Sequence, residues 1–247
     1  MIEPPVAFLR SGDGLRLAYR KREGRGPAII FLPGYASDMA GAKAVALDRF
    51  AATRGLALVR FDYSGTGLSD GNFEDGTLER WVADASAIID RLTDGPVVLV
   101  GSSMGGWIAL HLALQQRDRV AALVGIAAAP DFTDWGFPDR LKQRLAAGET
   151  LHREFPDGVQ VTTAAFWSSG QSMRLLESEI AVDCPIRLVH GDCDQDVPLD
   201  IALRLKDRAR SADVQVTVIK GGGHRLSEAH EIDAILRTVA AIVELPG

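Results

Sequence analysis

The chain has 247 residues, of which 47 % are hydrophobic and 24 % are charged, and its formal net charge is −6. This composition is typical of a globular protein and argues against disorder, collagen-like repeats and a coiled coil. The acidic balance disfavours binding to nucleic acid, because it supplies no basic surface for contacts with phosphates.

The N-terminal residues and the cysteines bear on the compartment. The first residues have neither the basic and apolar regions of a secretory signal nor the Arg- and Ser-rich pattern of a transit peptide. No run of about 18 apolar residues occurs, which predicts no transmembrane segment. The two cysteines, Cys184 and Cys193, flank a predicted strand whose ends lie too far apart for a disulfide. We therefore expect a cytoplasmic protein with two free thiols.

Short apolar runs alternate with helical patterns along most of the chain. The first segment, 6–22, breaks at Ser-Gly-Asp-Gly and predicts a β-hairpin. The later runs are rich in Val, Ile and Leu and nearly continuous, as in a parallel sheet that is covered on both faces. This alternation predicts an open α/β sheet with an antiparallel edge. The predicted parallel strands are 28–32, 57–61, 97–100, 121–126, 186–190 and 215–219, and the predicted helices lie near 40–53, 77–92, 105–116, 198–210 and 228–243.

Residues 130–183 interrupt this alternation after the sixth strand. The segment combines weak helical patterns and turns with several aromatic residues. We expect it to form a small helical cap within a single domain that spans residues 1–247. Trp135, Phe137 and Trp167 are its predicted substrate contacts, because aromatic side chains can line a cleft that buries an apolar group.

The strand at 97–100 is followed by Gly-Ser-Ser-Met-Gly at residues 101–105 and then by a helical pattern. This is G-x-S-x-G in the strand–turn–helix context that exposes a nucleophilic serine on a sharp turn. Gly101 and Gly105 leave room where the strand and the helix pass closely. Small residues also recur at ordinary strand-to-helix turns, so Ser103 needs support from elsewhere in the chain.

That support comes from the last two predicted strands. Asp192, Asp194 and Asp196 follow the first of them, and His224 follows the second. The order Ser, Asp, His is that of α/β-hydrolase triads, and the carboxyl ends of parallel strands meet at one edge of the sheet. Asp194 is the predicted acid, because helix capping explains Asp196 and ordering of the loop explains Asp192. Whether one of these neighbours shares the role stays open at this point.

Each residue type has a chemical purpose. His224 would take the proton of Ser103 and later protonate the leaving group, while the carboxylate holds the imidazole in the correct tautomer. The developing oxyanion needs two backbone N–H donors. Met104, which follows the nucleophile, is one candidate. Tyr35 is the other, since Gly34 permits a tight turn after the first parallel strand, although Pro-Gly there also suits a plain turn.

No metal or cofactor is predicted. His111, His152, His190 and His230 have no metal-ligating partner at suitable spacing, and His190 at a strand end is expected to satisfy backbone groups. Gly-Thr-Gly at 65–67 lacks the third glycine of a dinucleotide fingerprint, and 101–106 lacks the Lys-Ser/Thr of a phosphate-binding loop.

The motifs together resemble a known family. The chain is similar to α/β-hydrolases, and within them to palmitoyl-protein thioesterases and acyl-glucuronide esterases such as those acting on mycophenolic acid acyl-glucuronide. The resemblance implies an acyl hydrolase in which Ser103, Asp194 and His224 occupy the triad positions, here as a bacterial cytoplasmic member. The matching segments are Pro-Gly-Tyr at 33–35, 60–72, 94–96, 101–107, 184–188, 197–198 and 224–225.

The function predicted on these grounds is hydrolysis of esters or thioesters of apolar acyl groups, with a small molecule or an acylated protein as the substrate. A C–C bond hydrolase or a lactonase with the same triad is the first alternative. A noncatalytic binding protein on the same fold is the second, because fold does not fix function. We expect a monomer or a weak dimer.

Overall fold

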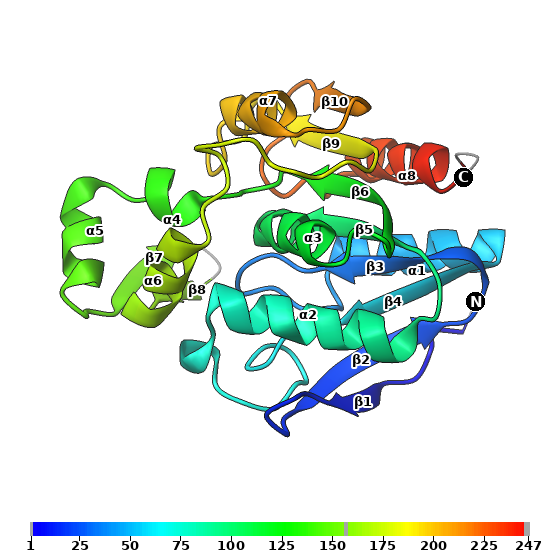
Figure 1. Ribbon diagram of the computed structural model, residues 1–247, viewed down its shortest axis with the longest axis horizontal. Helices are drawn as coiled ribbons and strands as arrows, with labels where there is room; N and C mark the ends of the chain where they lie inside the picture. Colours follow the sequence, from blue (N-terminus) through cyan, green and yellow to red (C-terminus); the bar gives the residue numbers. More distant parts are fainter. Residues whose placement is uncertain (1, 156–157, 245–247) are drawn as a thin grey trace.

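The computed structural model describes residues 2–155 and 158–244, which are organised around one large sheet (Figure 1). Its strands are β1 (Ala7–Arg10), β2 (Arg16–Arg22), β3 (Arg25–Leu32), β4 (Leu56–Phe61), β5 (Val97–Ser102), β6 (Val120–Ile126), β9 (Ile186–Gly191) and β10 (Val214–Ile219). The helices that pack on it are α1 (Ala42–Arg54), α2 (Leu78–Leu92), α3 (Met104–Gln115), α7 (Leu199–Arg208) and α8 (Ala229–Val243), and a 3₁₀ turn, η1 (Phe73–Asp75), precedes α2. The predicted strands and helices are confirmed, with shifts of a few residues at their ends.

The strands follow the order β1-β2-β4-β3-β5-β6-β9-β10 across the sheet. β2 is antiparallel to both β1 and β4, and the other neighbouring pairs are parallel. The central pair is β3 and β5, in which Leu32 lies opposite Gly101. The loops that follow these two strands therefore start side by side at the carboxyl edge of the sheet, where open α/β folds bind ligands.

Helices cover both faces of the sheet, which explains the nearly continuous apolar strands. α1 and α8 share one buried cluster with one face, while α2, α3 and α7 share a larger cluster with the other (Figure 1). β5 and β9 are buried along their whole lengths. The edge strand β10 is only partly covered, and its Val218 is 47 % exposed. This double covering holds the strand ends, and thus the loops beyond them, on a rigid base.

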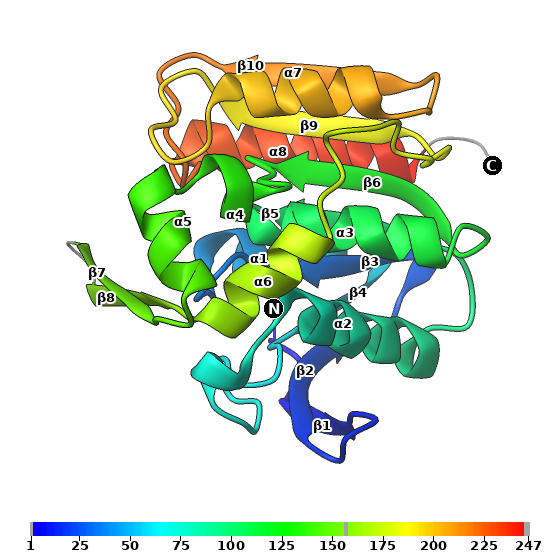
Figure 2. The same cartoon turned by 60° about the vertical axis from the view of Figure 1, so that its left-hand side comes forward.

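The insertion between β6 and β9 forms the predicted cap at one end of the sheet (Figures 1 and 2). It also contains an antiparallel hairpin that the sequence did not predict, in which Arg153 lies opposite Gln160. The two strands pair only with each other and lie outside the main sheet. Their sequences therefore do not have the continuous apolar runs that the strands of the main sheet have. The cap consists of α4 (Phe132–Trp135), α5 (Asp139–Ala146), β7 (Leu151–Phe155), β8 (Gly158–Thr162) and α6 (Ala164–Ser172).

Buried side chains join the cap to the base. Phe166 of α6 is 1 % exposed and belongs to the same cluster as α2 and α3. At the start of the cap, Asp131 adopts a left-handed conformation with φ of 60°. Its buried carboxylate accepts hydrogen bonds from the backbone N–H groups of Leu175 and Leu176, which follow α6. One side chain thus ties the beginning of the cap to its end.

Candidate active site

Ser103 lies on the turn between β5 and α3 in a strained backbone conformation, with φ of 53° and ψ of −119°. Its backbone N–H donates to the carbonyl of Ile126 over 2.9 Å, which fixes the turn against β6. A Cβ on Gly101 would lie 2.3 Å from the Gly105 carbonyl oxygen, and one on Gly105 would lie 2.1 Å from that of Leu32. Both positions therefore require glycine, as the motif predicts, because neither contact could be relieved without moving backbone.

The structure brings Ser103 and His224 together from distant parts of the chain. His224 Nε2 lies 3.0 Å from Ser103 Oγ, and His224 Nδ1 lies 2.9 Å from Asp194 Oδ2. These are hydrogen-bond distances on both sides of one imidazole ring. The arrangement lets the ring accept the serine proton at Nε2 while Nδ1–H donates to the carboxylate.

The Asp194 side chain is fully buried, with an exposure of 0 %. Burial by itself raises the pKa of Asp194, but hydrogen bonds from His224 and from the backbone N–H groups of Asp196 and Val197 outweigh it, so the pKa lies below its usual value. His190 Nε2 also lies 3.4 Å from Asp194 Oδ2. The carboxylate is therefore held ionised and oriented, as an imidazole partner requires.

The two neighbouring aspartates have different surroundings, although the Asp196 carboxylate lies within 4.8 Å of the ligand atoms of Asp194 and His224. Asp192 is exposed and accepts a hydrogen bond from the backbone N–H of Gly221 over 2.6 Å, so it orders the loop as predicted. The prediction that Asp196 caps the following helix is wrong, because α7 has Pro198 at its N-cap with no side-chain cap. Asp196 is exposed at the mouth of the site. Asp194 instead accepts hydrogen bonds from the backbone N–H groups of Asp196 and Val197, which orders the loop before α7.

One group of metal-ligating atom types occurs among the described residues. Atoms of Asp194, Asp196 and His224 lie within 4.8 Å of one another. Asp194 and His224 are already hydrogen-bonded to each other, so we assign this group to the Ser–His–Asp arrangement.

The predicted oxyanion residues flank Ser103. Met104 is buried at the first position of α3. On the opposite side, a Cβ on Gly34 would lie 3.3 Å from both the Ser102 carbonyl oxygen and Ser103 Cβ. The turn before Tyr35 thus passes directly against Ser103, and the roles of the Tyr35 and Met104 N–H groups as oxyanion donors stay predictions.

The predicted substrate contacts in the cap have different surroundings. Phe137 is 4 % exposed and packs with Leu145 and Leu151 in a separate core of the cap, so its main role is in folding. Trp135 and Trp167 are half-buried, and their indole N–H groups donate to backbone carbonyls of the cap. They stay predictions as substrate contacts.

Two aromatic residues that the sequence analysis did not single out lie nearer to the oxyanion loop. The Tyr35 ring contacts Phe166 at a centroid distance of 4.6 Å and Phe132 at 5.9 Å. The only signal in the sequence is their presence in an aromatic-rich insertion, because the contacts join residues about 100 and 130 positions apart in the chain.

The other histidines serve the fold where their contacts are described. His190 is buried, and its Nε2 lies 2.9 Å from the carbonyl oxygen of Val197, as expected for a residue that satisfies backbone groups. His111 Nε2 lies 3.0 Å from the Met173 carbonyl oxygen, and burial lowers the pKa of His111. His152 and His230 are exposed.

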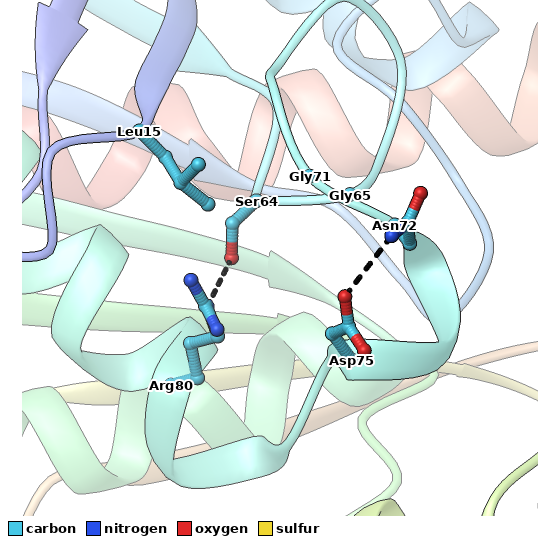
Figure 3. A pocket seen from close by; sticks show the side chains of 7 residues that line it. All are labelled: Leu15, Ser64, Gly65, Gly71, Asn72, Asp75 and Arg80. Atoms are coloured by element: carbon cyan, nitrogen blue, oxygen red, sulfur yellow. Dashed lines mark hydrogen bonds between the residues drawn. The ribbon is translucent and has the colours of Figure 1, made fainter.

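A separate cavity of about 270 Å³ lies beside the loop that follows β4 (Figure 3). Its polar groups already have partners: Arg80 Nε donates to Ser64 Oγ over 3.0 Å, and Asn72 donates to Asp75 over 3.2 Å. Neither Ser103 nor His224 lines this cavity. We therefore assign it no part in the chemistry.

The covered, mostly parallel sheet, the serine on a strained turn and the Asp and His after later strands define a hydrolase of the α/β class. Residues 29–238 match the family described as the alpha/beta hydrolase family, and the chain belongs to it. The family resemblance seen in the motifs is thereby confirmed.

Named relatives extend over almost the whole chain. Human mitochondrial palmitoyl-protein thioesterase ABHD10 is 40 % identical over 245 residues, which cover 97 % of this chain and 80 % of the relative. The structure of mouse alpha/beta hydrolase domain-containing protein 10 matches with a TM-score of 0.90 and 37 % identity, covering 97 % of this chain and 98 % of the mouse chain. A hydrolase structure from Agrobacterium vitis matches with a TM-score of 0.90 and 35 % identity, covering 97 % of this chain and 100 % of the Agrobacterium chain.

These similarities support a hydrolase that acts on ester or thioester bonds.

Both cysteines, Cys184 and Cys193, are free thiols. Within residues 2–155 and 158–244, no helix is long and apolar enough to cross a membrane.

Proposed function

We propose that this protein is a serine hydrolase that cleaves esters or thioesters of apolar acyl groups through an acyl-enzyme, with Ser103 as nucleophile, His224 as base and Asp194 as its carboxylate partner. The observation that carries the proposal is the continuous hydrogen-bonded path from Ser103 Oγ through the imidazole to the buried carboxylate, with links of 3.0 and 2.9 Å. The relatives named palmitoyl-protein thioesterases favour an acyl thioester as the substrate.

The chemistry runs in two halves. Ser103 Oγ attacks the acyl carbonyl carbon as its proton moves to His224 Nε2, and the carbonyl oxygen becomes an oxyanion that accepts hydrogen bonds from the backbone N–H groups of Tyr35 and Met104. The bond to the leaving oxygen or sulfur breaks, and that atom takes the proton from His224. Water, deprotonated by His224, then attacks the acyl-enzyme and releases the carboxylic acid and free Ser103.

The environment of the nucleophile suits an apolar acyl group. Aromatic side chains from the base and the cap gather next to the oxyanion loop: Tyr35, Phe73, Trp81, Phe132 and Phe166. Of these rings Tyr35, Phe73 and Phe132 are only partly buried, whereas Trp81 and Phe166 are core residues. An acyl chain that enters between base and cap would contact the exposed parts of the first three, and each Å² of apolar area removed from water contributes about 25 cal/mol. The half-buried Trp135 and Trp167 are further candidates for this contact.

Substitution of the nucleophile is the direct test. Ser103→Ala should lower kcat for p-nitrophenyl octanoate and for an octanoyl thioester by about 10³-fold or more, because the acyl-enzyme cannot form. A fluorophosphonate probe should label the wild type and not the variant. Ser172→Ala, on an exposed serine of α6, is the matched control and should retain activity. Full hydrolysis by Ser103→Ala, or failure of the wild type to react with the probe, would contradict the proposal and favour a noncatalytic role.

The compartment and the oligomeric state are separate proposals. We keep the cytoplasm as the predicted location, whereas the relatives with the name ABHD10 are mitochondrial proteins. Fractionation of cells that express the full chain tests the location, and sedimentation tests the predicted monomer or weak dimer.

A further inference from the structure

The side chain of Tyr35 joins the oxyanion loop to the cap hairpin. Its hydroxyl donates to the Val161 carbonyl oxygen of β8 over 2.6 Å. Burial raises the pKa of Tyr35 far above its usual value. A hydrogen bond with Thr162 and the nearby charge of Arg153 lower this pKa, but their effects are smaller than that of burial. The phenol therefore stays neutral and keeps its proton for this bond.

The Tyr35 ring is held independently of its hydroxyl. Phe73, Trp81, Phe132 and Phe166 surround it, with centroid distances between 4.6 and 5.9 Å. Such aromatic contacts fix the ring through packing. Removal of the hydroxyl alone would thus leave the ring in place and release only the hairpin.

The other strand of the hairpin packs within the cap. Arg153 of β7 donates to Gln160 across the hairpin, and its guanidinium lies 4.7 Å from the centre of the Phe137 ring. Burial lowers the pKa of Arg153, and the negative charge of Asp196 partly opposes this. The hairpin thus meets the oxyanion loop through β8 and packs on the cap core around Phe137 through β7.

We propose that the Tyr35 hydroxyl is a positioning group that fixes the cap hairpin beside the nucleophile, where the hairpin forms part of the wall against which a long acyl chain binds. This rests on the proposed acyl hydrolase function. The backbone of Tyr35 would serve every substrate by binding the oxyanion, whereas its hydroxyl would matter more for acyl groups long enough to reach the hairpin. Selection of acyl length would then depend on this one hydrogen bond.

Tyr35→Phe tests the proposal with two esters that share one leaving group, p-nitrophenyl acetate and p-nitrophenyl octanoate. The ratio of kcat/KM for octanoate to that for acetate should fall about fivefold, the value expected for loss of one ordinary hydrogen bond, and mainly through a higher KM for octanoate. A loss of active protein, or a weaker oxyanion site, would lower both rates alike and leave the ratio unchanged.

Tyr63→Phe is the matched control, because the Tyr63 hydroxyl also contacts a backbone carbonyl, that of Pro33 at 3.4 Å, but does not reach the cap. Its ratio should equal that of the wild type. Hydrogen exchange gives a readout without substrate: amides of β7 and β8 should exchange faster in Tyr35→Phe and not in Tyr63→Phe, while those of β5 stay protected.

The outcomes separate this inference from the proposed function. If the wild type hydrolyses neither ester, the proposed function fails. If it hydrolyses both, and Tyr35→Phe keeps the wild-type ratio and wild-type exchange in the hairpin, only the role of the hydroxyl is overturned.

Discussion

Asp194 illustrates how a single residue acquires its role from its surroundings. It is one of three aspartates within five positions, yet only its side chain is fully buried and bonded to His224. Its second oxygen accepts the backbone N–H groups of Asp196 and Val197 over 2.9 and 2.8 Å. These bonds orient the carboxylate before the imidazolium forms, which lowers the reorganisation that the reaction requires.

Replacement of the two aspartates should therefore have unequal effects. Asp194→Asn should lower kcat by about 10³- to 10⁴-fold, because the amide favours the wrong tautomer of His224. Asp196→Asn, the matched control at an exposed position, should lower kcat less than about tenfold. Steady-state kinetics with one ester decides this. An equal loss in both variants would show that Asp196 shares the role of the acid.

At the scale of elements, the cap depends on how its two ends meet. Asp131 follows β6 directly and binds the backbone N–H groups of Leu175 and Leu176 at the far end of the insertion. Its φ of 60° suits Asp and Asn better than most residues, since their short polar side chains tolerate this conformation. One carboxylate thus connects the two ends of the cap, and α4 and α6 pack together within it.

Asp131→Ala should lower the free energy of unfolding by about 2–4 kcal/mol, because one buried and one partly buried N–H group lose their acceptor and alanine resists positive φ. Asp131→Asn keeps the backbone preference and one acceptor oxygen, so it should lose about half as much. Urea denaturation measures both. Equal stability of the wild type and Asp131→Ala would rule out this anchoring role.

At the scale of the whole molecule, carboxyl groups respond to acid in two ways. Burial raises the pKa values of Asp62, Asp84 and Asp131, so their ionised forms are disfavoured in the fold. Asp213 is a contrasting case, because its hydrogen bonds to Arg187, between β9 and β10, lower its pKa. A carboxyl group whose pKa is lower in the folded than in the unfolded protein stabilises the fold at pH values above its unfolded-state pKa. This stabilisation is lost as the pH falls through its folded-state pKa.

The Asp213–Arg187 pair therefore predicts a pH-dependent difference. The Tm of the wild type should exceed that of Asp213→Asn at about pH 6, and the difference should shrink toward zero as pH falls below about 4 and Asp213 becomes protonated. Thermal unfolding monitored by circular dichroism across this range provides the measurement. A difference that stays constant with pH would show that the ion pair is not its cause.

The sequence predicted the sheet closely and the cap only in outline. Strands such as 97–100 and 186–190 are buried on both faces, so their apolar runs are visible without knowledge of any partner. The hairpin of β7 and β8 was missed because each strand has only five residues and pairs with no strand of the main sheet, so the alternation of Val159 and Val161 is too short to stand out. Phe132 and Phe166 were missed for another reason: their importance comes from contact with Tyr35, which lies in a distant segment of the chain.

By itself, the sequence determined the class of the protein and identified Ser103 and His224 as candidates, because a G-x-S-x-G turn is a local pattern and the order of residues at strand ends can be read along the chain. The tertiary structure decided which aspartate faces the imidazole and which side chains surround the oxyanion loop. The bonds of His224 join residues 30 and 121 positions apart, and Tyr35 reaches Val161 across 126. Such contacts depend on how loops and cap pack in three dimensions, and no local periodicity encodes them.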